Sequence, residues 1–182
     1  MQGEPKPGAP GAGNLDTIVL PHLDAAYNLA RWLVRNPQDA EDVVQDACLR
    51  AVRFAGGYRE GNPRAWLLRI VRNTAYSFLE KKRPAELAEP FDETIHMQPS
   101  GDAEAALLRA TESRALQVAL EALPVRFREA LILRELEGLS YKEIASVMEI
   151  PIGTVMSSLA RARAQLRERL LAGRAGEVRH GL

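Results

Sequence analysis

Two short helices around a tight turn are encoded near the C-terminus, and this unit limits the possible folds more than any other feature. The stretch reads GLSYKEIASVMEIPIGTVMSSLARARAQL (residues 138–166). Gly138 can adopt the left-handed conformation that ends a helix. Ser140 and Glu143 fit the S-x-x-E capping box that begins a new one. Pro151 disfavours a helical residue before it, so a second helix is expected to begin at or near Pro151.

The second helix of this unit has an apolar stripe opposite a face that is small at its start and basic further along. The stripe has the spacing of one helical face and consists of Ile152, Val155, Leu159, Ala162, Leu166 and Leu170. The outward face carries Gly153, Thr154, Ser157, Ala160 and Arg161, with Arg163 and Arg167 on one flank and Ser158 and Gln165 on the other. Hydroxyls and arginines on a close-fitting helix suit bases and phosphates. The pattern favours a DNA-binding helix–turn–helix, although an ordinary amphipathic hairpin with solvated arginines has the same spacing.

Composition favours an all-α protein. Hydrophobic residues make up 46% of the 182 residues, which is enough for one or two small cores, whereas aromatic residues make up only 5%. Cys48 is the single cysteine, and we expect it to be a buried free thiol of a cytoplasmic protein. No nucleophile, base or set of metal ligands converges, and no stretch has the length of a transmembrane helix. We therefore expect no enzymatic activity, metal, cofactor or membrane insertion.

Charge is segregated along a chain whose formal net charge is zero. Residues 64–83 contain six Lys/Arg and one Glu, which gives +5, and residues 151–182 contain six Arg and two Glu, which gives +4. Between them, residues 86–104 contain six acidic residues and no Lys/Arg, which gives −6. Two basic helical regions separated by an acidic spacer predict two contacts with a polyanion.

The rest of the chain predicts further helices and flexible connections. Residues 1–14 are rich in proline and glycine and predict a disordered tail. A helix over residues 16–34 is expected to break or bend at Leu20–Pro21, and Asn36 is expected to cap the next helix, with Pro37 at its first position. The apolar faces of that helix are expected to comprise Val43, Val44, Ala47, Cys48, Val52 and Phe54. A helix is expected to open at Pro124 and close at Gly138, with an apolar set of Phe127, Leu131, Ile132, Leu133 and Leu136. Residues after Ala172 are expected to fray.

The helix expected over residues 63–83 is the second informative segment. Its core stripe comprises Leu67, Ile70, Val71, Thr74 and Phe78, and its reverse face Arg69, Arg72, Asn73, Tyr76, Glu80 and Arg83. Arginine neutralises phosphates, asparagine hydrogen-bonds base edges and an aromatic ring stacks on bases. The spacing fits nucleic-acid contact and ordinary packing of Tyr76 between solvated arginines equally well.

Three segments, in this order, resemble the extracytoplasmic-function (ECF) class of bacterial sigma factors. They are DAEDVVQDACLRA (39–51), NPRAWLLRIVRNTA (62–75) and LPVRFREALILRELEGLSYKEIASVMEIPIGTVMSSLARAR (123–163). The resemblance covers roughly residues 16–171 and implies two small helical domains joined by an acidic linker. We expect a region 2-like domain at residues 15–84, the linker at 85–103 and a region 4-like helix–turn–helix domain at 104–172, with tails at 1–14 and 173–182.

The resemblance implies a sigma factor that binds core RNA polymerase, recognises minus-ten and minus-thirty-five promoter elements and directs transcription of a stress or envelope-type regulon. It also implies an anti-sigma factor as a partner. The expected polymerase contacts are Asp39, Asp42 and Gln45. The expected minus-ten contacts are Arg69, Arg72, Asn73, Tyr76 and Arg83, and the expected minus-thirty-five contacts are Thr154, Ser157, Ser158, Arg161 and Arg163. The chain departs from residues common in the family at Glu80, Met156 and Ser158, so the family's promoter sequence does not transfer.

A stand-alone LuxR-type regulator is the alternative, because its output domain shares the pattern G-x-S-x-x-E-I-A. That reading requires an N-terminal receiver or ligand domain and a symmetric dimer. The first 85 residues instead predict helices with a basic face. A helical interaction protein, such as an anti-sigma partner, is a further alternative, but it leaves the two basic regions unexplained.

Overall fold

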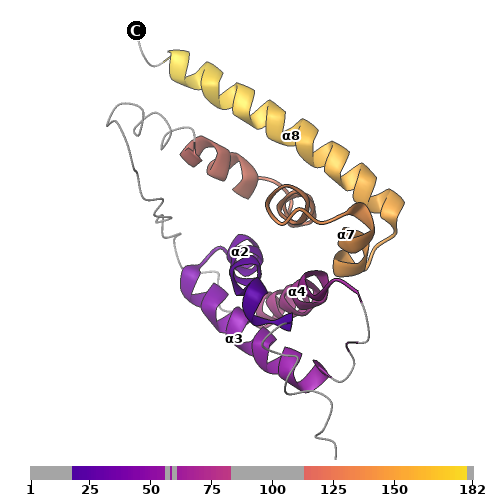
Figure 1. The fold of residues 1–182 in the computed structure, drawn as a ribbon. Helices are drawn as coiled ribbons and strands as arrows, with labels where there is room; N and C mark the ends of the chain where they lie inside the picture. The colour runs from indigo at the N-terminus through magenta and orange to yellow at the C-terminus, as the bar shows by residue number, and fades with distance from the viewer. Residues whose placement is uncertain (1–17, 56–57, 59–60, 83–112, 180–182) are drawn as a thin grey trace, which may run out of the picture. The chain divides into compact units, whose positions relative to one another are not determined.

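The computed structural model describes residues 18–55, 58, 61–82 and 113–179. Within these ranges the secondary structure is entirely helical, which confirms the expected all-α class. The chain forms two compact units that divide after Lys82 (Figure 1). The expected N-terminal tail, the acidic linker and Arg83 lie outside the described residues.

The first unit is built from three helices that pack against one another in every pairing. A short 3-10 turn, η1 (Leu20–His22), leads into α2 (Leu23–Val34), which is followed by α3 (Pro37–Phe54) and α4 (Pro63–Lys82) (Figure 1). Many of the buried side chains are alanines, which allow helix axes to approach closely. The residues with no exposed surface are Ala26, Leu29, Ala30, Ala40, Ala47, Ala51, Leu67, Leu68, Val71 and Ala75.

Local sequence signals set the helix ends of this unit as expected. Pro21 lies in the 3-10 turn that separates residues 18–19 from α2. The Asn36 side chain caps α3 by accepting a hydrogen bond from the Asp39 backbone N–H at 3.1 Å, and Pro37 is the first helical residue. Asn62 plays the same part for α4, where its Oδ1 accepts a hydrogen bond from the Arg64 backbone N–H at 3.0 Å. Each cap satisfies a backbone N–H that has no partner within the helix.

Only some of the apolar residues expected on the faces of α3 are buried. Val43 and Ala47 are buried, but Val52 and Phe54 are 56% and 61% exposed. These last two apolar residues therefore lie outside the packed face of α3. The buried set of Ala40, Val43, Ala47 and Ala51 follows helical spacing, and it turns Val52 and Phe54 outward.

The second unit contains the helix–turn–helix. Residues 113–121 form a helix, followed by α6 (Val125–Leu131), the π-helical turn η4 (Ile132–Leu136), α7 (Tyr141–Met148) and α8 (Ile152–Arg179). Helix α6 packs against both η4 and α8. Gly138 has a φ of +64°, and the Ser140–Glu143 capping box is complete at the start of α7, as predicted. Helix α8 begins directly after Pro151, which confirms the expected start of the second helix.

The π turn η4 explains why Leu136, the last residue of the expected apolar set, is exposed. The Glu137 N–H donates to the Ile132 carbonyl oxygen at 3.0 Å, a five-residue step instead of the four of an α-helix. The extra residue shifts the helical phase, so Leu136 is 56% exposed while Glu137 is only 3% exposed. Leu136 therefore lies outside the packed core, unlike Ile132 and Leu133 of the same apolar set.

Helix α8 is longer than expected. It continues to Arg179, whereas the sequence was expected to fray after Ala172. Residues 173–179 contain no proline, and propagation of an existing helix adds one hydrogen bond for each residue that it fixes. The backbone therefore remains helical past the point at which the apolar spacing ends.

A buried arginine ties the first helix of the second unit to α6. Arg128 is 1% exposed, and its Nη1 donates to the Glu121 carbonyl oxygen at 2.9 Å. From α8, Arg169 Nη2 donates to the neighbouring Ala122 carbonyl oxygen at 3.2 Å. These guanidinium groups satisfy carbonyls at the C-terminal end of the helix at residues 113–121, which have no partner within that helix.

Replacing Arg128 with methionine is expected to lower the free energy of unfolding of the second unit by about 2 kcal/mol, because the partly buried hydrogen bond from its guanidinium group to the Glu121 carbonyl oxygen is lost. Far-UV circular dichroism in urea measures the change. Trp32 and Trp66, the only tryptophans, both lie in the first unit, so their fluorescence transition should stay in place. Arg126→Met, at an exposed position on the same helix, is the matched control. Equal urea midpoints for the two variants would contradict the assigned role of Arg128.

Candidate nucleic-acid interface

One side of α4 gathers three of the expected minus-ten residues into a contiguous cluster. The Arg72 guanidinium carbon lies 4.7 Å from the centroid of the Tyr76 ring, which is cation–π distance. Arg72 Nη1 also donates to Asn73 Oδ1 at 3.3 Å. Because arginine has only donors, this contact turns the Asn73 oxygen toward Arg72 and leaves the amide nitrogen as the donor for another group. Asn73 is exposed, whereas Arg72 and Tyr76 are half-buried.

The remaining α4 residues frame this cluster. Arg69 is half-buried one turn before Asn73, and Glu80 is exposed one turn after Tyr76. Thr74, on the opposite side, is 3% exposed and donates its hydroxyl to the Ile70 carbonyl oxygen at 2.8 Å. The helix therefore separates a packed face from a polar and aromatic face, as the sequence predicted, although Ile70 and Phe78 of the expected core stripe are only half-buried.

Two aromatic residues lie at the connection between α3 and α4. The rings of Tyr58 and Trp66 have centroids 5.4 Å apart and are tilted by 60°. The Tyr58 hydroxyl donates to the Gly61 carbonyl oxygen at 2.8 Å. Gly61 has a φ of +131°, a conformation that glycine adopts without strain. Trp66 is thus a packing residue that helps to order the start of α4.

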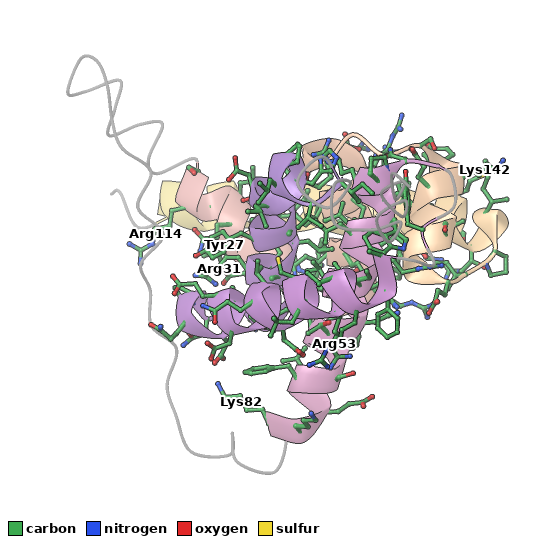
Figure 2. All side chains as sticks on the ribbon, turned by 60° about the horizontal axis from the view of Figure 1, so that its bottom comes forward. Tyr27, Arg31, Arg53, Lys82, Arg114 and Lys142 are labelled. Atoms are coloured by element: carbon green, nitrogen blue, oxygen red, sulfur yellow. The ribbon has the colours of Figure 1, made fainter. Side chains whose placement is uncertain are left out.

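The three expected polymerase-binding residues of α3 are in different environments. Asp42 and Gln45 are exposed. Asp39 is paired with Lys82, which extends from the last turn of α4 (Figure 2), and the Nζ–Oδ2 distance is 2.6 Å. The Asp39 side chain is only 15% exposed. Its carboxylate therefore joins α3 to the end of α4 within the unit.

Apolar residues lie on the exposed side of α3, and the sequence did not indicate that they would be exposed. Leu49 is 58% exposed and lies one turn beyond Gln45, and Val52 follows three residues later. Together with Asp42 and Gln45 they form a mixed acidic and apolar surface. The alanine spacing of α3 was the signal that could have placed them outside the core.

The helix–turn–helix presents a small polar face on α8. Ser157 and Arg161 are exposed and Thr154 is half-buried. Met156 and Ile152 are 54% and 50% exposed, so two apolar side chains border this face near its start. Apolar groups at such positions can contact the methyl group of thymine in a major groove. The expectation that Ile152 belongs to the buried stripe was wrong.

Ser158 does not lie on this face. It is 4% exposed and lies between Val155 and Leu159 on the side of α8 that also buries Ala162. Its position in the helical repeat sets this orientation, although its small polar side chain suggested the surface. The placement of Ser158 among the exposed flanking residues was therefore wrong, and we exclude it from the candidate DNA contacts.

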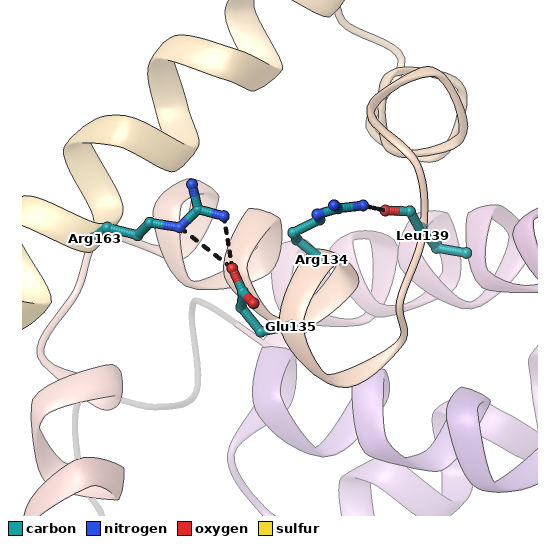
Figure 3. Close-up of polar contacts among 4 residues, drawn as sticks. All are labelled: Arg134, Glu135, Leu139 and Arg163. Atoms are coloured by element: carbon teal, nitrogen blue, oxygen red, sulfur yellow. Dashed lines mark hydrogen bonds and ion pairs between the residues drawn. The ribbon is translucent and has the colours of Figure 1, made fainter.

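Arg163 is held by an acidic residue of η4. Its Nη2 and Nε lie 2.7 Å and 3.3 Å from Glu135 Oε1 (Figure 3). Hydrogen bonding to Glu135 raises the pKa of the Arg163 guanidinium, and Tyr141 shifts this pKa in the same direction. Arg163 is thus cationic throughout the physiological range, with part of its hydrogen-bonding capacity committed within the domain.

Other chemical features of the described residues are modest. Cys48 is half-buried, less buried than expected, and burial raises the pKa of its thiol above the usual value. No cluster of three or more His, Cys, Asp or Glu with metal-binding geometry occurs within the described ranges. In the same ranges, no helix has an apolar stretch long enough to traverse a bilayer.

This combination of features defines a class of protein. An all-helical chain with a helix–turn–helix in one unit and a basic, aromatic helix face in the other has the features of a DNA-binding transcription protein.

Two family models match the two units. Sigma-70 region 2 matches residues 18–84 and Sigma-70 region 4 matches residues 113–166. The chain is 38% identical over 157 residues to the RNA polymerase sigma-H factor of Pseudomonas aeruginosa, and the match covers 81% of each chain. It is 35% identical over 158 residues to the ECF RNA polymerase sigma factor SigE of Mycolicibacterium smegmatis, where the match covers 85% of this chain and 61% of the relative.

A solved structure is similar over most of the chain. The sigma factor RpoE of Bartonella quintana, crystallised with the anti-sigma factor NepR, is 29% identical with a TM-score of 0.73, and the match covers 87% of this chain and 98% of that one. The chain therefore belongs to the ECF class of the sigma-70 family of RNA polymerase sigma factors.

Proposed function

We propose that this chain is a promoter-specificity subunit that binds core RNA polymerase, recognises minus-ten and minus-thirty-five elements and directs the initiation of transcription. One observation carries the proposal: both segments that define a two-domain sigma factor, region 2 and region 4, lie on the same chain in that order. A LuxR-type regulator would require a receiver or ligand-binding domain where the region 2 match lies. The first unit has instead the three mutually packed helices α2, α3 and α4.

The proposal divides the contacts among three helices. The exposed α3 residues Asp42 and Gln45 bind polymerase. Asp39, the third proposed polymerase-binding residue, is paired with Lys82 and helps to hold α3 in place. The α4 face binds the minus-ten element through Arg69, Arg72, Asn73 and Tyr76. Arg83, further along the chain, is the fifth proposed minus-ten contact. The start of α8 reads the minus-thirty-five element through Thr154, Ser157, Arg161 and Arg163. In this division the region 2-like domain spans residues 15–84, the acidic linker 85–103 and the region 4-like domain 104–172.

Electrostatics explains why such a chain needs polymerase. Its formal net charge is zero, and the affinity of a protein for duplex DNA rises with the number of phosphates that it neutralises. Two modest basic surfaces neutralise few phosphates. Mounting both domains on polymerase raises their effective concentration at the promoter, so contacts that are weak alone become sufficient together.

An anti-sigma factor is the further partner that we propose. The support is that the similar Bartonella sigma factor was solved with an anti-sigma factor bound. Because its proposed partners, polymerase and the chromosome, are cytoplasmic in bacteria, we place its action in the cytoplasm.

Run-off transcription tests this function. Purified core polymerase would be mixed with the chain and with a library of genomic promoter fragments, and the transcripts sequenced. We expect transcripts that start downstream of one shared pair of elements and disappear when the chain is omitted. Transcription at the level of core polymerase alone, combined with tight binding of the chain to a palindromic duplex, would favour the LuxR-type alternative.

A further inference from the structure

The contact between Glu135 and Arg163 joins the two elements on either side of α7. Glu135 lies in the π turn η4 and Arg163 in α8, 28 residues later. Figure 3 shows the carboxylate against one edge of the guanidinium group. Both hydrogen bonds go to the same oxygen, Oε1, from Nη2 at 2.7 Å and from Nε at 3.3 Å.

The ion pair with Glu135 orients the Arg163 guanidinium group without occupying all of it. Nη1, which makes neither of these two bonds, points away from Glu135 in Figure 3. The Arg163 side chain is 47% exposed. A guanidinium group has five donors in a rigid plane, so a carboxylate that holds one edge fixes the direction in which the other edge points.

Contacts of the neighbouring residue Arg134 hold the π turn that carries Glu135 in place. Its neighbour Arg134 donates from Nη1 to the Leu139 carbonyl oxygen at 2.8 Å (Figure 3). The Arg134 guanidinium carbon also lies 5.0 Å from the centroid of the Tyr141 ring. These contacts fix the π turn to the start of α7, and through Glu135 they reach α8.

The contribution of the Glu135–Arg163 ion pair to the stability of the fold does not by itself explain its presence. Both side chains are about half exposed, 47% for Arg163 and 53% for Glu135, and exposed ion pairs contribute little to stability. A carboxylate beside a DNA-binding helix also repels phosphates. Its presence there is better explained by the orientation that it imposes on Arg163.

We propose that Glu135 is a positioning residue for promoter binding, which orients the Arg163 guanidinium so that its outer edge meets a phosphate of the minus-thirty-five duplex. The inference rests on the proposed function, because it assigns a DNA phosphate as the ligand of Arg163. It adds a residue of opposite charge, outside the recognition helix, to the machinery of DNA binding.

Equilibrium binding of holoenzyme to a duplex tests the proposal. The probe is a promoter fragment selected from a random library by wild-type holoenzyme, and binding is measured over a range of salt concentrations. Arg163→Ala should lose one phosphate contact, which weakens binding about fivefold and reduces the slope of log affinity against log salt by about 0.9. Glu135→Ala should weaken binding about threefold in the same direction. Added to Arg163→Ala, it should weaken binding no further, because Glu135 supports binding only through Arg163.

Whether Glu135→Ala weakens or strengthens DNA binding distinguishes a positioning role of Glu135 from simple repulsion between its charge and the phosphates. Removing a negative charge near DNA should by itself strengthen binding, so weakening by Glu135→Ala points to orientation. Glu135→Gln keeps an acceptor oxygen and should retain most of the affinity, which a general loss of structure would not allow. Glu149→Gln, at an exposed carboxylate shortly before α8, is the matched control and should not weaken binding.

Tighter binding by Glu135→Ala, or an undiminished effect of Glu135→Ala in the Arg163→Ala background, would overturn the positioning role and leave the proposed function intact. Failure of wild-type holoenzyme to select any promoter would overturn both.

Discussion

Replacing Arg72 and Asn73 together with alanine is expected to reduce open promoter complexes at least about 100-fold, while the holoenzyme still assembles. Arg72 stacks on Tyr76 and orients the Asn73 amide, so the double substitution removes both the positive charge and the oriented donor. In the proposed function, the α4 face would hold a base that leaves the duplex when the minus-ten element melts. Extruding a base from a duplex costs a few kcal/mol, and each 1.4 kcal/mol of lost compensation lowers the population of open complexes about tenfold. Permanganate reactivity of unpaired thymines measures the melted promoter directly.

The matched control is Arg31→Ala, which removes a positive charge from α2 of the same unit (Figure 2). It should leave open-complex formation near the wild-type level. Affinity for core polymerase should be unchanged in both variants. If the double variant loses polymerase binding instead, the α4 face is a protein contact; if it melts promoters normally, base capture lies elsewhere.

Reversing the charge of Asp42, together with Gln45→Ala, is expected to weaken the binding of core polymerase at least about 100-fold. Both residues are exposed on α3 beside the apolar Leu49. A surface that combines exposed apolar groups with an acidic residue suits a partner with apolar and basic groups, and juxtaposed like charges in an interface cost several kcal/mol. Fluorescence anisotropy of the labelled chain, titrated with core polymerase, measures the loss.

Two further variants sharpen this test. Asp24→Arg reverses an exposed charge on α2 and should leave the affinity for polymerase close to wild type. Asp39→Asn should have a smaller effect than Asp42→Arg, because Asp39 is largely buried in its pair with Lys82. Asp39→Arg is a poorer probe, since it would place two positive charges side by side within the fold. Wild-type affinity of the Asp42→Arg, Gln45→Ala variant would remove α3 from the proposed interface.

Features that depend on adjacent residues were predictable from the sequence. The caps at Asn36 and Ser140, the left-handed Gly138 and the break at Pro21 each follow from the chemistry of one short segment. The all-helical class and the helix–turn–helix follow from the spacing of apolar residues over longer windows. These signals also placed Asn73, Ser157 and Arg161 on exposed faces, where the structure has them.

Features that depend on packing or on distant partners were not predictable. In α3, small alanines rather than large apolar residues set the buried face, so Val52, which was expected on an apolar face, is exposed. The π turn changes the helical phase by one residue and exposes Leu136, and no short pattern in the sequence marks it. The pairs of Asp39 with Lys82 and of Arg163 with Glu135 join residues 43 and 28 positions apart, and they exist only because the helices pack together.

The most direct test of the account compares promoter binding by the chain alone with binding by the same chain on core polymerase. The probe is a duplex selected by the holoenzyme, and a scrambled duplex is the reference. We predict that the chain alone binds both duplexes weakly and with little preference, and that the holoenzyme prefers the selected duplex by at least about 1,000-fold, the lower end of the range for specific DNA-binding proteins. Tight and selective binding by the chain alone, unchanged when core polymerase is added, would contradict the account.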